Sequence, residues 1–126
     1  KNIDIYDIGQ IYDYSKFKLS PVLAYHDVMN CGYRLYFPDK KIFHITDTAH
    51  LEGIHAKDYD LYAIEANYDE EKIKENIDEK RQKNEFAYET GSINSHLSIK
   101  QCHEFYLNNK KESSELIYLH QSKNNI

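Results

Sequence analysis

Hydrophobic and polar positions along the first part of the chain alternate with the period of β-strands. Residues 2–9, NIDIYDIG, alternate polar and apolar side chains, which predicts a half-buried strand. Residues 17–27 continue in extended form, although Pro21 argues against a central, uninterrupted strand there. Residues 32–47 contain two β-rich runs around the turn-forming cluster 38–40, Pro-Asp-Lys, and predict a β-hairpin.

Two later segments have the features of helices. Residues 68–84 carry acidic side chains in the first turn and basic ones in the last, which matches the helix dipole. The apolar stripe of this segment is thin, so we expect it to lie on the surface. Residues 96–109 contain Ser98 and Gln101 at the spacing of a capping box, followed by apolar positions that predict one buried face.

Two short apolar runs predict further strands, at residues 59–67 and at residues 115–120. Strands that alternate with helices after a β-rich start indicate an α/β layered sheet. The length of 126 residues is that of one domain, which we place at residues 1–126.

Composition and charge narrow the classes of function. Hydrophobic residues make up 40% of the chain and charged residues 29%, as in a globular protein. The net charge of −5 argues against a broad nucleic-acid surface but allows a small phosphate-binding cleft. Cys31 and Cys102 have no spacing typical of a disulfide framework or a zinc knuckle. Because no apolar run reaches the roughly 18 residues of a membrane span and no signal peptide is visible, we expect a cytoplasmic protein without membrane contact.

Four polar residues lie where a predicted strand ends or a predicted helix begins. Asp47 ends the strand KIFHITD, Glu65 lies at the end of YAIEAN, and His120 ends the last strand. His96 precedes the predicted helix cap at Ser98. The carboxyl ends of strands are where α/β sheets bind ligands, so these groups could converge on one edge.

This set of side chains is suited to a hydrolytic metal site. Carboxylate oxygen and imidazole nitrogen are ligands for zinc or manganese, which polarise phosphoryl or carbonyl groups. A carboxylate beside a histidine can also fix the tautomer and orientation of the ring. The sequence therefore predicts a metal-dependent hydrolytic centre at this edge.

The segments KIFHITDT, YAIEANYDE, NSHLS and YLHQSKNN occur in an order that resembles the C-terminal half of a metallo-β-lactamase-fold hydrolase. The closest branch is that of phosphodiesterases and nucleases, with ribonuclease Z and the bacterial and phage exonuclease-like members. The resemblance implies that Asp47 bridges metals, that His120 is a late metal ligand, and that His96 lies near the scissile phosphate with support from Glu65. The segment AYHDVMNCGYRLYF is similar to the HD…GY strand pair of this family, with no metal role implied for His26.

The resemblance implies a partial metallo-β-lactamase fold, with one mixed β-sheet and helices on one face. The H-x-H-x-D-H signature of the family, which provides most of its metal ligands, does not occur in the chain. Because the chain also begins with Lys1 rather than methionine, we expect it to be a fragment of a longer protein. The missing N-terminal half, or a homodimer mate, would then cover an otherwise exposed apolar sheet face.

Three classes of function follow from this resemblance. The first, which we favour, is a fragment of a zinc- or manganese-dependent hydrolase of phosphodiesters, with a nucleic acid or a nucleotide as substrate. We expect this fragment to be inactive without the H-x-H-x-D-H half. The second is a binding or inhibitory module that has lost its chemistry, and the third is a hydrolase of another ester or thioester. We further expect Asp47 and His120 at neighbouring strand ends, and His96 hydrogen-bonded to Glu65.

Overall fold

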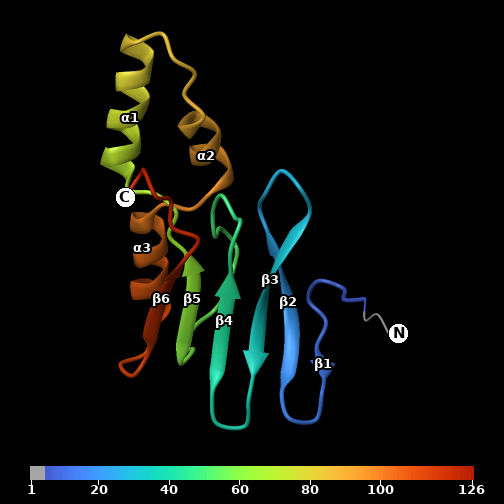
Figure 1. Cartoon of the computed structure of the whole chain (residues 1–126). Coiled ribbons are helices and arrows are strands. Elements are labelled where there is room, and N and C mark those ends of the chain that lie inside the picture. Colours follow the sequence, from blue (N-terminus) through green and yellow to red (C-terminus); the bar gives the residue numbers. More distant parts are fainter. Residues whose placement is uncertain (1–4) are drawn as a thin grey trace.

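The computed structural model describes residues 5–126, which form one six-stranded β-sheet and three helices (Figure 1). The strands lie across the sheet in the order β1-β2-β3-β4-β5-β6, which is also their order along the chain. In chain order the elements are β1 (Tyr12–Asp13), β2 (Lys18–Ala24), β3 (Asn30–Tyr36), β4 (Lys41–Ile45), β5 (Leu61–Glu65), α1 (Glu70–Gln82), α2 (Glu89–Ser95), α3 (Ile99–Asn109) and β6 (Glu115–Leu119).

The sheet is antiparallel in its first half and parallel in its second. Strands β1 to β4 pair antiparallel, whereas β5 pairs parallel with both β4 and β6. The predicted hairpin of residues 32–47 is confirmed, because β3 and β4 are antiparallel neighbours joined through residues 37–40. Parallel pairing brings the carboxyl ends of β4, β5 and β6 to one edge of the sheet. The fold is therefore α/β with one mixed sheet, as the sequence predicts.

One face of the sheet forms the hydrophobic core under α3 and the loop of residues 46–60. The rings of Phe43 and Phe105 stack with their centroids 5.6 Å apart, and those of Tyr62 and Tyr106 meet edge to face at 5.4 Å. Phe43 and Tyr62 are fully buried. These contacts attach α3 to the centre of the sheet. Aromatic pairs stabilise such packing because they bury large apolar areas and because stacked and edge-to-face arrangements of rings are favourable.

The opposite face, here called the open face, is apolar, and none of the described helices packs against it. Leu23 and Ile117 on this face remain 42% and 49% exposed. The strand registers place the following side chains on the open face: Leu19, Leu23, Cys31, Tyr33, Leu35, Ile42, His44, Leu61, Ala63 and Ile117. Contiguous exposed apolar surface of this kind marks an interaction surface.

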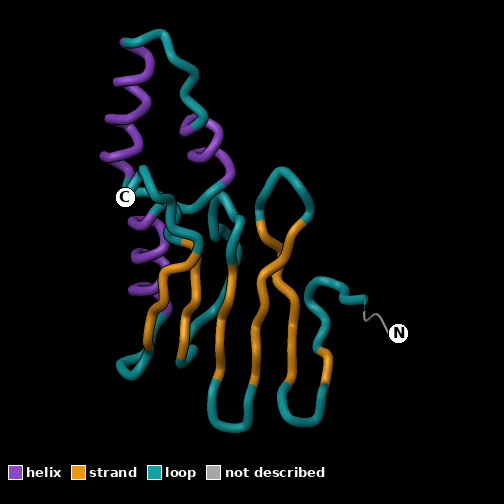
Figure 2. The backbone as a smooth tube through the Cα atoms, viewed as in Figure 1, coloured by secondary structure: helices purple, strands orange, loops and turns teal. Residues whose placement is uncertain are grey.

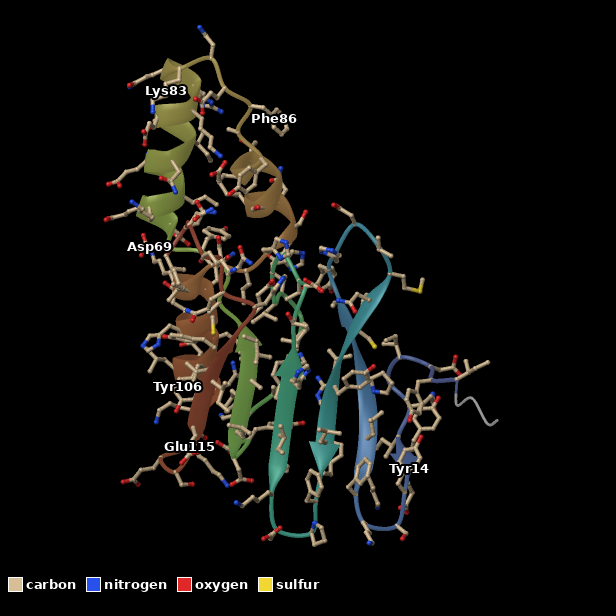
Figure 3. The ribbon with its side chains drawn as sticks, viewed as in Figure 1. Tyr14, Asp69, Lys83, Phe86, Tyr106 and Glu115 are labelled. Atoms are coloured by element: carbon tan, nitrogen blue, oxygen red, sulfur yellow. The ribbon has the colours of Figure 1, made fainter. Side chains whose placement is uncertain are left out.

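Helices α1 and α2 lie beyond the carboxyl ends of the parallel strands rather than over the sheet (Figure 2). Helix α1 confirms the prediction for residues 68–84 and begins at the side-chain cap Asp69. Figure 3 shows Asp69 near the strand ends, with Lys83 and Phe86 at the far end of this pair of helices. The two helices therefore stand beside the edge at which the sequence places its candidate site.

The capping box predicted for residues 96–109 is confirmed at the start of α3. The Gln101 backbone N–H donates to Ser98 Oγ at 3.0 Å, and the Ser98 backbone N–H donates to Gln101 Oε1 at 2.9 Å. The seven-residue α2 was not predicted, because it is short, contains Gly91 and lacks a side-chain cap. Within residues 5–126, no helix has the length and apolarity needed to cross a membrane.

The strand predicted for residues 2–9 is wrong for the described part of that segment. Residues 5–9 form no strand, and residues 2–4 lie outside the described residues. Gly9 has a φ of +83°, and its N–H donates to the Pro21 carbonyl at 3.1 Å. The chain turns here instead of continuing extended, which glycine permits and an alternating pattern does not reveal.

The expectation that Pro21 argues against a central, uninterrupted strand is wrong in one respect, because β2 continues through Pro21 without interruption. Pro21 lies opposite Tyr33 of β3, and its carbonyl accepts from Gly9 on the other side. In an antiparallel strand the N–H and C=O of one residue point to the same neighbour. The N–H that proline lacks would thus face away from β3, so no hydrogen bond between β2 and β3 is lost.

We expect Gly32→Ala to destabilise the fold, and we expect the matched change Gly91→Ala to be neutral or slightly stabilising. A Cβ on Gly32 would lie 2.7 Å from the His44 backbone oxygen and 2.7 Å from Ile45 Cγ1. Overpacking of a core typically costs about 1–3 kcal/mol. A Cβ on Gly91 meets nothing within 4 Å, and alanine is favoured in helices by up to about 1 kcal/mol. Urea unfolding measures both variants, and equal midpoints would contradict this packing of β3 on β4.

Candidate metal centre

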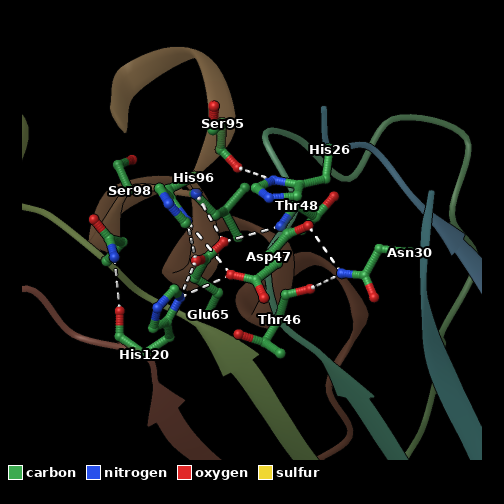
Figure 4. Close-up of polar contacts among 12 residues, drawn as sticks. His26, Asn30, Thr46, Asp47, Thr48, Glu65, Ser95, His96, Ser98 and His120 are labelled. Carbon is green, nitrogen blue, oxygen red and sulfur yellow. Dashed lines mark hydrogen bonds and ion pairs between the residues drawn. The ribbon is translucent and has the colours of Figure 1, made fainter. Parts of the chain in front are cut away.

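Asp47, Glu65, His96 and His120 converge at the carboxyl edge of the parallel strands (Figure 4). Each offers one possible ligand atom, and these atoms lie within 4.8 Å of one another. Asp47 follows β4, Glu65 ends β5, His120 follows β6, and His96 lies between α2 and α3. The structure thus brings together all four residues that the sequence singled out.

The Glu65 carboxylate lies at the centre of this group and is fully buried. Its Oε1 atom lies 2.7 Å from His96 Nδ1 and 2.8 Å from His120 Nδ1. Its Oε2 atom accepts from the backbone N–H groups of Thr48 and Leu97, each at 3.1 Å. The contact that we expected between Glu65 and His96 is confirmed as a direct hydrogen bond. Four donors offset the desolvation of this buried charge.

Asp47 and His120 form the more exposed side of the cluster. Asp47 Oδ1 lies 3.1 Å from His120 Nδ1 and 3.8 Å from His96 Nδ1. The Asp47 and His120 side chains are 40% and 47% exposed, whereas that of Glu65 is 0% exposed. We expected these two residues at neighbouring strand ends, and this is wrong, because β5 lies between β4 and β6. The two side chains nevertheless meet across the tip of β5.

Asp47 and His120 both have left-handed backbones, with φ of 52° and 53°. Such conformations are uncommon outside glycine and are found at functional sites. The backbone carbonyl of each residue accepts a hydrogen bond from an asparagine side chain. Asn30 Nδ2 donates to Asp47 O at 3.2 Å, and Asn67 Nδ2 donates to His120 O at 2.8 Å. These two asparagines hold the turns that aim the Asp47 and His120 side chains at Glu65.

The hydrogen bonds of Glu65 also determine which ring nitrogen of each histidine carries hydrogen. A carboxylate oxygen accepts hydrogen bonds, so Nδ1 of His96 and Nδ1 of His120 both donate to Oε1. The lone pair of each neutral ring is then on Nε2. The chain therefore presents two oriented imidazoles next to the half-exposed carboxylate of Asp47.

The donor set fits zinc or manganese. Two carboxylates and two imidazoles within one small cluster are the ligand types that these cations take. Of the four groups, Asp47 and His120 are the most accessible to an ion from solvent. Glu65 is already bonded to four donors, and it orients the histidines in the way that supporting carboxylates do in metal sites.

Several residues that support the site were not identified from the sequence. Thr48 links Glu65 to the β2–β3 loop, because its Oγ1 accepts from the Tyr25 backbone N–H at 2.9 Å. Asn30 and Asn67 hold the turns at Asp47 and His120. Asn67 lies two residues after Glu65 and Thr48 lies one residue after Asp47, so adjacency to the predicted site was the only local signal.

No protein-family model matches the sequence, and no curated protein is significantly similar to it. Solved structures do match. The metallo-beta-lactamase fold protein YhfI from Bacillus subtilis superposes with a TM-score of 0.67 and 13% identity, covering 96% of this chain and 43% of that protein. The short form of human tRNase Z superposes with a TM-score of 0.58 and 17% identity, covering 89% of this chain and 38% of that protein.

The chain thus has the metallo-beta-lactamase fold over nearly all of its length, as the sequence resemblance implied. It spans less than half the length of each matched protein. The similarity supports the α/β class and the partial character of the fold. It also coincides with a cluster of side chains that could bind a metal.

In the metal-free protein, we expect the Nδ1–H tautomer for both His96 and His120, because both rings donate to Glu65 Oε1. Long-range ¹H–¹⁵N correlation of the imidazoles distinguishes the two tautomers. The exposed His103 of α3 is the internal reference, for which we expect the Nε2–H tautomer that predominates in neutral histidine side chains in water. Glu65→Gln should alter the patterns of His96 and His120 and leave His103 unchanged. Nε2–H patterns for His96 and His120 would contradict this arrangement.

Proposed function

We propose that this chain is the C-terminal part of a metal-dependent hydrolase that acts on phosphodiesters. The observation that carries the proposal is the convergence of Asp47, Glu65, His96 and His120 within 4.8 Å at the carboxyl edge of a metallo-beta-lactamase-fold sheet. Hard and borderline ligands of this kind, next to an ordered histidine, are suited to hydrolysis assisted by a divalent cation. The substrates would be nucleic acids or nucleotides.

In this proposal Asp47 and His120 hold zinc or manganese. Both side chains are about half exposed, and their backbones are fixed in left-handed turns. A cation bound there supplies Lewis-acid polarisation of a phosphoryl oxygen. A second set of protein ligands is needed for a complete site, because two side chains leave most of the coordination to water.

His96 and Glu65 are proposed as the pair that handles the proton. Glu65 is fully buried and fixes His96 through the 2.7 Å bond to Nδ1. This bond leaves Nε2 of His96 to exchange a proton with a substrate oxygen, as a general acid or base does. The side chain of His96 is 20% exposed, so a substrate could reach it from the solvent side of the cluster.

A phosphodiester is favoured over other esters for two reasons. The motifs EAN and SHLS, which carry Glu65 and His96, resemble those of the phosphodiesterase and nuclease branch. One matched structure is a tRNase Z, with a TM-score of 0.58. The net charge of −5 means that affinity for a polyanion would depend on bound cations and a few local donors.

We also propose that a further β-layer of the same protein covers the open face and brings the remaining metal ligands. Glu65 lies two residues after Ala63 in β5, so its side chain is on the same face of the sheet, the open face. It pairs with Leu119, as Ala63 pairs with Ile117, and it therefore lies at the end of this face where the parallel strands have their carboxyl ends. A layer packed on the open face would therefore end next to Asp47 and His120. The same contact would bury the apolar side chains and complete the metal site. In the absence of that layer, a second copy of the chain can pack on the open face, so we expect the isolated chain to form a dimer.

We expect the chain of 126 residues by itself to hydrolyse no phosphodiester at a measurable rate and to bind zinc or manganese weakly. Two ligands give an ion little advantage over full hydration. Calorimetric metal titration should show weak binding that Asp47→Ala and His120→Ala both abolish, with Asp39→Ala in the β3–β4 turn as the matched control. Turnover of bis(4-nitrophenyl) phosphate and a short DNA duplex is measured in parallel. Metal-dependent turnover that both site variants abolish would show that no further ligands are needed.

We expect Cys31 to report whether the open face is covered. It is half-buried on that face, whereas burial raises the pKa of the Cys102 thiol to about 12 and makes it unreactive. Reaction of Cys31 with a thiol reagent should slow as protein concentration rises, together with a dimer seen by light scattering.

The control for this experiment is a matched pair of variants. Ile117→Lys places a charge on the open face and should keep the chain monomeric, with Cys31 reactive at every concentration. Leu107→Lys changes a similarly exposed apolar residue of α3, away from that face, and should behave as the parent chain. A monomer whose Cys31 reactivity is independent of concentration would refute self-association through the open face.

A further inference from the structure

His96 differs from the other three residues of the cluster because it does not lie at or directly after the end of a strand. It lies in the extended segment between α2 and α3, with φ of −129° and ψ of 157°. On its carboxyl side the segment is bonded to the end of β5. The Leu97 N–H donates to Glu65 Oε2, and the Leu97 carbonyl accepts from the Asn67 N–H. On its amino side the segment continues directly from Ser95, the last residue of α2. The position of His96 thus depends on what holds the end of this short helix.

The β2–β3 loop contacts the end of α2 through two consecutive residues. His26 Nδ1 lies 3.1 Å from the Ser95 carbonyl oxygen, and Ser95 Oγ donates to Asp27 Oδ2 at 3.2 Å. A carbonyl oxygen only accepts, so Nδ1 of His26 is the donor. Carbonyls in the last turn of a helix have no partner within the helix, and His26 satisfies this one.

His26 also lies next to the ring of His96. The two ring centroids are 5.7 Å apart and the rings are tilted by 52° (Figure 4). The His26 side chain is half-buried, and its hydrogen bond to Ser95 and ring contact with His96 both go to this one segment. His96 is therefore in contact with Glu65 through Nδ1 and with His26 through its ring.

These contacts form a closed circuit that returns to Glu65. Glu65 Oε2 accepts from Thr48 N–H at 3.1 Å, and Thr48 Oγ1 accepts from Tyr25 N–H at 2.9 Å. Tyr25 precedes His26, which donates to Ser95, and Ser95 precedes His96, which donates back to Glu65. A closed circuit restrains each member from two directions, as preorganised sites require.

We propose that His26 is a positioning residue for His96, acting through the Ser95 carbonyl and through ring contact. A catalytic role for this positioning rests on the proposed function, in which His96 transfers a proton. His26 would then make the β2–β3 loop contribute to that transfer. The geometry is separate from metal binding, since His26 is not one of the four clustered groups. Nothing in the proposal requires His26 to change its protonation.

The test is imidazole NMR on the metal-free protein, which can succeed or fail whatever the protein hydrolyses. In the parent chain we expect a Nδ1–H tautomer for His26 and a nuclear Overhauser contact between the His26 and His96 rings. His26→Leu should move the His96 imidazole signals further than those of His120, whose ring meets that of His96 edge to face at 5.0 Å. His26→Asn should bring the His96 signals part of the way back, because its amide N–H lies where Nδ1 was and can donate to Ser95, whereas it lacks the ring that contacts His96.

Ser95→Ala is the matched control, because it removes the bond to Asp27 and keeps the carbonyl that His26 contacts. It should leave the His96 signals close to those of the parent chain. Unchanged His96 signals in His26→Leu would overturn the proposal, as would equal displacement of His96 and His120, which indicates a general loss of structure. If His26→Leu does not fold, spectra of the parent chain still test the proposal. A His26 ring in the Nε2–H tautomer, or the absence of a nuclear Overhauser contact between the His26 and His96 rings, would refute the proposal.

Discussion

The buried carboxylate of Glu65 is the constraint on which the candidate site depends. A charge removed from water is strongly unfavourable unless donors surround it, and Glu65 has four. Two of these donors are backbone N–H groups, at Thr48 and Leu97, and two are the rings of His96 and His120. Because these donors come from three segments far apart in the sequence, satisfying one side chain fixes the turn after β4, the segment before α3 and the tip of β6 together.

The two faces of the sheet differ in what they contact, and the candidate site lies where they meet. Aromatic contacts such as Phe43 with Phe105 complete one face within this chain. The open face keeps Leu23 and Ile117 about half exposed, and Glu65 continues it toward the cluster. Under the proposed function, a single further layer would bury this apolar surface and complete the metal coordination. Stability and activity would then depend on the same contact.

Two of the errors of sequence interpretation, at residues 2–9 and at Pro21, have one physical cause, which is that local patterns do not report the hydrogen-bonding direction of a strand. Alternation in residues 2–9 predicted a strand, but the turn at Gly9 directs its N–H to Pro21 instead. Pro21 was expected to interrupt β2. Its ring faces away from β3, on the side where β1 pairs only with Lys18 and Leu19, so β2 loses no hydrogen bond to β3 and continues. Both outcomes depend on which neighbour lies on each side, which only the assembled sheet determines.

The sequence by itself determined the hairpin at residues 37–40, the capping box of α3, the α/β class and the identity of the four clustered residues. These features depend on turn chemistry, local capping and the rule that strand ends carry ligands, all of which act over a few residues. Tertiary structure alone decided that β5 separates β4 from β6, that Asp47 and His120 adopt left-handed turns, and that His26 reaches Ser95. The reason is physical: such contacts join segments 17 to 69 positions apart, and their geometry follows from strand register and packing rather than from local preference.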